Sequence, residues 1–469
     1  MLLLADKPLR SGCLVIGVCA VVLASCLWSC REEKSPPANE RRVVVVVSGD
    51  TAGWIIPCGC TTHQSGGLLR RGTYVEKQRE EADVILLDAG GAPGGTSPYQ
   101  RLKFEAILEG ERLMGLAAHN IGGPEVALGL ANLQEASRKT GARLISANLR
   151  DSVGRPVFDG WTIIETAGRR LAVIGVISPR YAAGDVRIED PKAAVLASLQ
   201  QLEGRHDGVV VMAYLPEDEL QRLATELPEV DAVIGGPTGQ PIAPRAVGPT
   251  VLAAATNKGK FLVQLEFAAA GNAGPPTGQV VELTGDWPDD RGQLANLRRY
   301  LEELNRRSFE PHQTDLVPSA PPDVPPGYRV AGSATCRECH ERDNELWDAS
   351  RHAKAWEDLK AMERHVDPYC QQCHTTGYGL PGGFVTVAKS PDRLGVGCEA
   401  CHGPSQVHVE EPERRTPFDA KDQCTRCHDQ ENSPAFGYER YWEKIKHGET
   451  KGTQPDRLGP RPSGTETQP

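Results

Sequence analysis

The sequence predicts two domains of different kinds: an α/β domain of layered sheets and helices, then a smaller domain organised around a repeated cysteine–histidine motif. Short branched apolar runs alternate with helix-like stretches over residues 42–285, which is typical of α/β layers. Four copies of Cys-x-x-Cys-His lie within residues 331–448. The total length of 469 residues is sufficient for about three domains.

Residues 1–30 have the features of an export signal. Lys7 and Arg10 precede the apolar run "CLVIGVCAVVLA", and small residues follow it. The string "LASC", ending at Cys26, resembles a bacterial lipobox, whose cysteine is lipidated; a plain cleaved signal or an uncleaved anchor is the alternative. Residues 31–41 are then a polar tether. We expect an exported lipoprotein, anchored on the periplasmic side of a membrane.

Overall charge and composition argue against nucleic-acid binding and against a membrane span after the leader. The net charge of -10 and the absence of a basic stripe argue against nucleic acid. After the leader, no stretch approaches the roughly 20 apolar residues of a membrane span. The lipid anchor is therefore the predicted membrane contact.

The α/β domain is predicted from six apolar runs of buried-strand character. They are "RRVVVVVSGD", "ADVILLDAGG", "RLISANL", "RRLAVIGVISP", "HDGVVVMAYL" and "VDAVIGG". The stretches "LQEASRKTG" and "PEDELQRLATELP" between them are helix-like. Strands that end in Gly or Asp before a helix place functional loops at the strand ends.

The connecting stretch, 286–330, contains a polar-faced helix over 291–307 and the proline-rich linker "VPSAPPDVPPGY". We expect the helix to pack at the domain junction. At the other end of the chain, the tail 449–469 is too poor in apolar residues to fold.

The last third of the chain contains eight cysteines in four identically spaced pairs, each followed at once by histidine. This string is typical of c-type haem attachment: two thiols bond the porphyrin edge, and the adjacent histidine binds the iron. Zinc also uses Cys-x-x-Cys pairs, but it gives no reason for a histidine after every second cysteine. We therefore predict four covalently attached haems, on Cys336/Cys339/His340, Cys370/Cys373/His374, Cys398/Cys401/His402 and Cys424/Cys427/His428.

Four other histidines of this region are candidates for the second iron ligand. His352 begins the helix-like "HAKAWEDLKAMERH", which His365 closes, and His408 follows the third motif by six residues. His447 lies in "ERYWEKIKHG", predicted to be an amphipathic helix ending at Gly448. We predict His352, His408 and His447 as second ligands and His365 as a possible one.

Residues 331–448 resemble the tetrahaem cytochrome c-554 family, through "GSATCRECH", "LWDASRHAKAWEDL", "CQQCHTTGYG" and "GVGCEACHGPSQVH". The resemblance implies a mainly helical domain of closely stacked haems, most of them bound by two histidines. His352, His408 and His447 fall where that family places its second ligands. The haem at His374 is the candidate for an open face, because His365 has no clear counterpart.

Most of residues 43–267 resemble the metallophosphatase (5'-nucleotidase-like) fold, through landmarks such as "GGLLRR", "LLDAGG", "NIGGPEVALG" and "VIGVISP". That family binds two metals. Asp50 remains at a ligand position, but the other ligand and catalytic positions are occupied by Ala52, Gly91, Gly123, Pro124, Tyr214, Pro237 and Gly239. Because a two-metal site needs most of its ligands, we expect phosphatase activity to be absent.

The loop "IIPCGCTTHQSGG" places Cys58, Cys60 and His63 where the first metal ligand would lie. Three interpretations are open: a structural disulfide or idle thiols, a strained redox-active Cys-x-Cys pair, or a metal site. Elsewhere in this domain, His119 and His206 are expected at the surface or at helix ends, and Glu125 is expected to be structural.

Two functions follow from these features. The first is an electron carrier that exchanges electrons with redox partner proteins, its phosphatase-like domain serving for docking or sensing. The alternative is an oxidoreductase acting on a small nitrogen, sulfur or thiol substrate at an open haem or at Cys58/Cys60. A working nucleotidase with attached haems is a third hypothesis, which the lack of metal-ligand residues disfavours.

Overall fold

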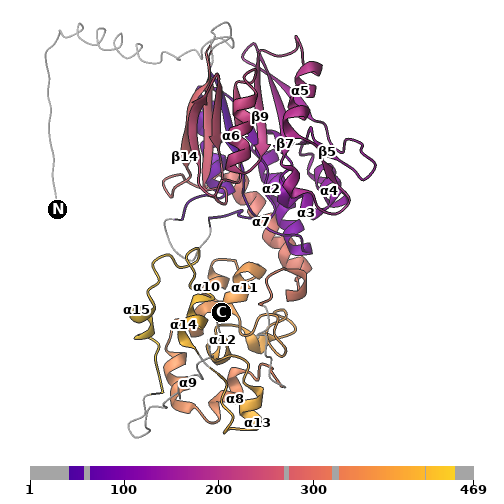
Figure 1. Ribbon diagram of the computed structural model, residues 1–469. Helices are drawn as coiled ribbons and strands as arrows, with labels where there is room; N and C mark the ends of the chain where they lie inside the picture. Colours follow the sequence, from indigo (N-terminus) through magenta and orange to yellow (C-terminus); the bar gives the residue numbers. More distant parts are fainter. Residues whose placement is uncertain (1–41, 58–63, 269–273, 319–326, 418, 449–469) are drawn as a thin grey trace, which may run out of the picture.

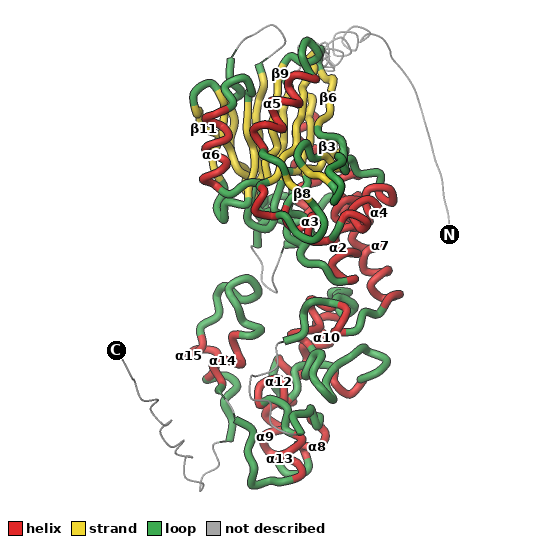
Figure 2. Tube along the Cα trace, turned by 45° about the vertical axis from the view of Figure 1, so that its right-hand side comes forward, coloured by secondary structure: helices red, strands yellow, loops and turns green. Residues whose placement is uncertain are grey.

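The computed structural model describes residues 42–57, 64–268, 274–318, 327–417 and 419–448. An α/β domain lies at one end of the molecule and a helical, loop-rich part at the other, with helix α7 (Arg291–Arg307) reaching from the first towards the second (Figures 1 and 2). The predicted fold classes of both parts are confirmed. Within the described ranges, no helix is long and apolar enough to cross a membrane.

The α/β domain contains two six-stranded sheets. In the first, the central strand β1 pairs in parallel with β2 and antiparallel with β13. Its order is β14 (Thr277–Glu282), β13 (Phe261–Phe267), β1 (Val43–Ser48), β2 (Asp83–Asp88), β3 (Leu116–Asn120), β4 (Leu144–Ile145). The order of the second is β11 (Ile242–Val247), β12 (Thr250–Ala254), β10 (Ala232–Gly236), β9 (Gly208–Tyr214), β7 (Arg169–Ile177), β6 (Trp161–Thr166). A small sheet pairs β5 (Leu149–Arg150) with β8 (Arg187–Ile188).

The polyvaline strand β1 shows how the layers form. Val43, Val45 and Val47 belong to the core between the two sheets, whereas Val44 and Val46 pack with the helices on the outer face of the first sheet. Because both faces are covered, every residue of β1 is buried, as its unbroken apolar run predicts. The helices of this domain are α1 (Leu68–Glu81), α2 (Pro98–Leu113), α3 (Gly123–Leu128), α4 (Leu130–Thr140), α5 (Pro191–Gln201), α6 (Glu217–Glu226) and the short η2 (Pro179–Tyr181).

Helix α7 occupies the residues predicted for it and joins the core of the α/β domain. It packs on α1 and α2, burying Leu297, Tyr300 and Leu304. The predicted position at the junction is thus reached by burying one apolar face, while the arginine-rich face stays exposed.

The C-terminal part consists of short helices joined by long loops. They are η3 (Pro311–Gln313), α8 (Ser333–Arg337), α9 (Glu341–Asp348), η4 (His352–Lys354), α10 (Ala355–Ala361), α11 (Pro368–His374), η5 (Pro391–Arg393), α12 (Cys398–His402), α13 (Gln406–Glu410), α14 (Ala420–Thr425) and α15 (Tyr438–Trp442).

Two predicted helices of this part are shorter than expected. The helix after His352 ends at Ala361, and Glu363 has a left-handed φ of 56°, so His365 lies beyond it. Helix α15 ends at Trp442, so His447 lies in an irregular segment and not in a helix that ends at Gly448. In both cases apolar periodicity continues past the point where the backbone turns.

Candidate functional site

Each Cys-x-x-Cys-His string begins on a short helix. In the second and third motifs the helix contains both cysteines, and one helical turn places residues i and i+3 on the same face. The turn continues into the histidine in the first and fourth motifs, where the backbone N–H groups of His340 and His428 each donate to the first cysteine's carbonyl at 2.9 Å. None of the eight motif cysteines forms a disulfide in the described chain, so each thiol can form a thioether.

Cys339 differs from the other seven motif cysteines, because its side chain is exposed whereas theirs are half-buried. Helix α8 ends at Arg337, so Cys339 lies in the turn beyond it, next to the equally exposed His340. In the described chain, the side of the first motif formed by Cys339 therefore faces solvent, and the close packing of haems that the resemblance implies stays a prediction. Haem attachment at Cys339 stays a prediction, and a haem bound there would have one edge at the surface.

Motifs that are distant in the sequence lie next to one another, and helices α12 and α14 of the third and fourth motifs also pack together. The thiol of Cys336 in the first motif contacts that of Cys398 in the third. Similarly, Cys427 of the fourth motif contacts Cys373 of the second. Groups attached to the first and third motifs, and to the second and fourth, would therefore be neighbours.

Three motif histidines each lie beside a histidine from a distant segment. The ring centroids are 6.2 Å apart for His340 and His408, and 6.1 Å apart for His428 and His352. The third pair, His402 and His447, is separated by 5.8 Å. Histidine–metal bonds of about 2 Å on each side would place the two nitrogens about 4 Å apart. Rings with centroids near 6 Å therefore fit one metal ion held between them, so the donor set fits haem iron.

His365 is placed differently. Its ring meets that of Trp356 edge-on, with centroids 6.0 Å apart, and its Nδ1 is buried without a hydrogen-bond partner in the described part of the chain. The structure thus brings three of the four candidate second ligands beside motif histidines, and packs the fourth against a tryptophan.

The Nδ1 atoms of the motif histidines have varied partners. That of His374 contacts the Ala355 carbonyl oxygen at 2.9 Å, and that of His428 contacts the Ser433 hydroxyl at 2.9 Å. The Nδ1 of His340 lies 3.8 Å from Asp343 Oδ2. The contacts of His374 and His428 are within hydrogen-bond distance, and a metal-binding histidine usually donates its second ring N–H in this way, which orients the ring and tunes its basicity.

Residues 335–403, which contain the first three motifs, match the family model "Cytochrome c554 and c-prime". This part of the chain resembles cytochrome c554. The cytochrome c-554 of Nitrosomonas europaea is 30% identical over 142 residues, which cover 23% of this chain and 60% of that protein. The predicted resemblance is confirmed, and with it a c-type cytochrome part that binds haem covalently.

The chain also aligns with solved phosphoesterases. The 5'-nucleotidase precursor of Thermus thermophilus aligns at 18% identity with a TM-score of 0.49, over 75% of this chain and 73% of that one. A calcineurin-like phosphoesterase of Bacillus subtilis aligns at 16% identity with a TM-score of 0.49, over 57% of this chain and 98% of that one.

In the α/β domain, the rings of Tyr214 and Tyr181 lie against Gly91 and Gly123, two positions where the resemblance to metallophosphatases would place functional side chains. A Cβ atom on Gly91 would lie 2.8 Å from Tyr214 Cε2, and one on Gly123 would lie 2.6 Å from Tyr181 Cδ1. The two rings meet edge-on at 5.1 Å. Glycine at these positions therefore makes room for the two aromatic rings.

Asp50, the remaining candidate ligand, is used by the neighbouring loop. Its Oδ2 accepts hydrogen bonds from Thr256 Oγ1 at 2.9 Å and from the backbone N–H of Asn257 at 3.0 Å. Burial raises the pKa of this carboxyl, and these hydrogen bonds oppose the rise. Its role in the described structure is to hold the loop after β12.

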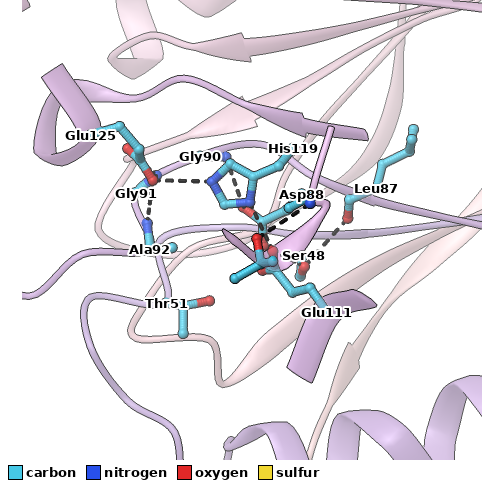
Figure 3. A network of polar contacts seen from close by, with 12 residues as sticks. Ser48, Thr51, Leu87, Asp88, Gly90, Gly91, Ala92, Glu111, His119 and Glu125 are labelled. Atoms are coloured by element: carbon cyan, nitrogen blue, oxygen red, sulfur yellow. Dashed lines mark hydrogen bonds and ion pairs between the residues drawn. The ribbon is translucent and has the colours of Figure 1, made fainter. Parts of the chain in front are cut away.

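Glu125 is structural, as predicted. Its carboxylate accepts backbone N–H bonds from Gly91 at 3.0 Å and from Ala92 at 2.8 Å (Figure 3). It also accepts the backbone N–H of Gly122 at 3.0 Å. These bonds tie the loop after β2 to the start of α3.

Beneath that loop lies a buried charged network that the sequence analysis missed (Figure 3). The prediction that His119 lies at the surface is wrong: it is fully buried on β3, with Nδ1 2.9 Å from Glu111 Oε2 and Nε2 3.2 Å from Glu125 Oε1. Arg71, also fully buried, lies 3.7 Å from both Asp88 and Glu111.

The positive charge in this network comes from Arg71 and His119. Burial disfavours a charged His119, but the carboxylates of Glu111 and Asp88 outweigh it and hold the histidine's pKa well above the usual value. Burial raises the pKa of Glu111 to about 7. Asp88, Glu111 and His119 lie close enough together to hold a metal ion, but the Arg71 guanidinium and the protonated His119 already balance the charges of the two carboxylates. We therefore interpret the cluster as a structural ion network.

Two groups of predicted site residues lie outside the described ranges: Cys26 in the leader, and Cys58, Cys60 and His63 in the loop after β1. Gln64, the next described residue after that loop, donates from Nε2 to the Glu431 carbonyl at 2.9 Å. The chain leaving the loop is therefore attached to the cytochrome part, three residues beyond His428.

Proposed function

We propose that this protein is an exported, membrane-anchored tetrahaem cytochrome that transfers electrons between redox partner proteins. The observation that carries the proposal is the set of three histidine pairs, in each of which a motif histidine faces a histidine from a distant segment. Iron bound by two histidines is suited to transferring single electrons.

The protein's own residues hold these ligands in place. Each pair joins two segments that are distant in the sequence, so the fold of the chain brings the two rings together. The contacts between Cys336 and Cys398, and between Cys373 and Cys427, favour short electron-transfer steps within each pair of haems.

The exposed position of Cys339 suggests where electrons enter or leave. A haem attached there would present an edge to solvent, and a redox partner protein could approach it closely. We therefore propose the first motif as the point of exchange with a partner.

The leader supports the proposed location. The basic residues, the apolar run and the lipobox-like "LASC" ending at Cys26 are suited to export and lipidation on the periplasmic side. Thioether attachment of haem also takes place outside the cytoplasm, in agreement with export.

The α/β domain is proposed to have no phosphatase activity and to serve for docking or sensing. The packing of Tyr214 and Tyr181 against Gly91 and Gly123 supports the loss of activity, because side chains of metal ligands would collide with these rings.

The test is a haem count and an electron paramagnetic resonance spectrum of the mature protein, expressed with haem-maturation machinery. We expect four haems per chain and low-spin signals from the three histidine-paired sites. A chain that binds zinc in place of haem, or has high-spin haems throughout, would refute the proposal.

An oxidoreductase acting on a small nitrogen, sulfur or thiol substrate is the second candidate. The position of His365 favours it, because its ring packs against Trp356, whereas the other three candidate second ligands lie beside motif histidines. Carbon monoxide binding by the reduced protein, with turnover of such a substrate, would favour this function. Low-spin haems that are all indifferent to carbon monoxide would exclude catalysis at that haem.

A further inference from the structure

The α/β domain contacts two haem-motif segments of the cytochrome part directly. Trp54 of the loop after β1 meets Tyr369 edge-on at 5.4 Å, and Tyr369 directly precedes Cys370. Lys258 forms an ion pair at 2.9 Å with Glu431, three residues beyond His428. Figures 1 and 2 show α10 at the end of the helical part that lies nearest the α/β domain, and Figure 1 shows α11 beside it.

The most buried of these contacts is a hydrogen bond from Tyr99 to Asp367. Tyr99 lies at the start of α2, is fully buried, and donates from its hydroxyl to Asp367 Oδ1 at 2.6 Å. Asp367 is itself only 9% exposed. The phenol is held by Phe309, edge-on at 6.1 Å, and by the Lys103 ammonium, 5.1 Å from its ring centroid.

Asp367 is the N-cap of α11, the helix that carries the second haem motif. Its carboxylate also accepts the Tyr369 backbone N–H at 3.0 Å, and its carbonyl accepts that of Cys370 at 2.9 Å. A buried carboxylate therefore lies within one helical turn of the first cysteine of this motif. The α/β domain supplies the phenol that shares its charge.

We infer that Tyr99, acting through Asp367, sets the reduction potential of the haem attached to Cys370 and Cys373. Tyr99 is a positioning residue in this inference, which rests on the proposed function because it requires haem on α11. The inference gives the phosphatase-like domain a role inside the molecule, in addition to any role in docking.

The physical argument concerns charge. Reduction adds an electron to the haem, so a nearby carboxylate disfavours reduction, more strongly in a buried setting than in water. A hydrogen bond from the tyrosine hydroxyl withdraws part of that negative charge. Removing the hydroxyl should therefore lower the potential, whereas removing the carboxylate charge should raise it.

The substitutions Tyr99→Phe and Asp367→Asn test whether the two changes shift the reduction potential in opposite directions. Asparagine is as good an N-cap as aspartate, so the start of α11 should be retained. The matched control is Tyr74→Phe, which removes another buried phenol whose hydroxyl bonds Gln264 inside the α/β domain.

The experiment is a spectroelectrochemical titration of the full-length haem-loaded protein, with the component of the second haem assigned by a His374→Met variant. Tyr99→Phe should lower that component, and Asp367→Asn should raise it. Each should change the oxidised-to-reduced ratio at fixed potential about threefold to tenfold, or ~30–60 mV. Tyr74→Phe should leave all components in place.

Shifts of the same sign in both variants, shifts shared by all haems, or no shift would overturn the inference and leave the proposed function standing. Absence of haem from α11 in the unaltered protein would overturn both. Because the two variants remove different atoms, failure of one to fold leaves the sign of the other as a decisive result.

Discussion

Replacing His408 with alanine removes one ring of the pair that it forms with His340. Their centroids are 6.2 Å apart, and no atom of an alanine side chain could bind iron from that position. The haem on the first motif should then lose its second ligand and become accessible to small molecules. His408 lies on α13, and alanine is the better helix former by about 0.5 kcal/mol, so the local backbone should persist.

The size of the expected change in carbon monoxide binding follows from the attachment of one haem to each motif. Relative to the unaltered protein, the variant should bind one further carbon monoxide per chain in the reduced state. One low-spin signal should be replaced by a high-spin signal. The same gain should follow from alanine at His352, on the fourth haem, and at His447, on the third.

The assay is a carbon monoxide titration followed by absorption, with electron paramagnetic resonance of the oxidised protein. His365→Ala is the matched control, because its ring packs against Trp356 and should add no binding site. An unchanged stoichiometry in His408→Ala, or a gain in His365→Ala, would refute the assignment of ligands.

Three other predictions concern charge and packing. Asp343→Asn, beside the first motif histidine, should raise the potential of that haem in a redox titration, and Glu345→Gln on the exposed face of the same helix should change it less. The pKa of Glu111 is raised from 4.5 to about 7, so its contribution to the free energy of unfolding is complete below pH 4.5 and is lost as pH rises through 7. Urea denaturation from pH 4.5 to 8 should show this loss, and Glu111→Gln should reduce it. Gly91→Asp should destabilise the protein by about 2–4 kcal/mol, through a left-handed φ of 86° and contact with Tyr214, without restoring manganese-dependent phosphate release. Phosphate release above background in that variant would contradict our account of the domain.

Features that depend on neighbouring residues could be predicted from the sequence. Cys-x-x-Cys-His places its donors within one helical turn, so the chemistry of the motif is visible in five letters. The apolar runs predicted β1, β2, β7, β9 and β10 in the same way, because strands buried on both faces need no alternation. The strand β3 was missed because it is short and ends in His119 and Asn120, polar residues that propensity does not assign to a buried strand.

The sequence by itself determined the number of haem motifs and the α/β class of the first domain, since both are written in contiguous stretches of residues. Only the tertiary structure decided which second histidine faces which motif, because the members of each pair come from distant segments. It also decided that Cys339 is exposed while the other motif cysteines are half-buried, although all four motifs have the same spacing. The packing of Tyr214 and Tyr181 above the glycines, and the meeting of Arg71, Glu111 and His119 from separate elements, were decided in the same way. Contacts of this kind depend on how the chain folds back on itself, so no local pattern of residues encodes them.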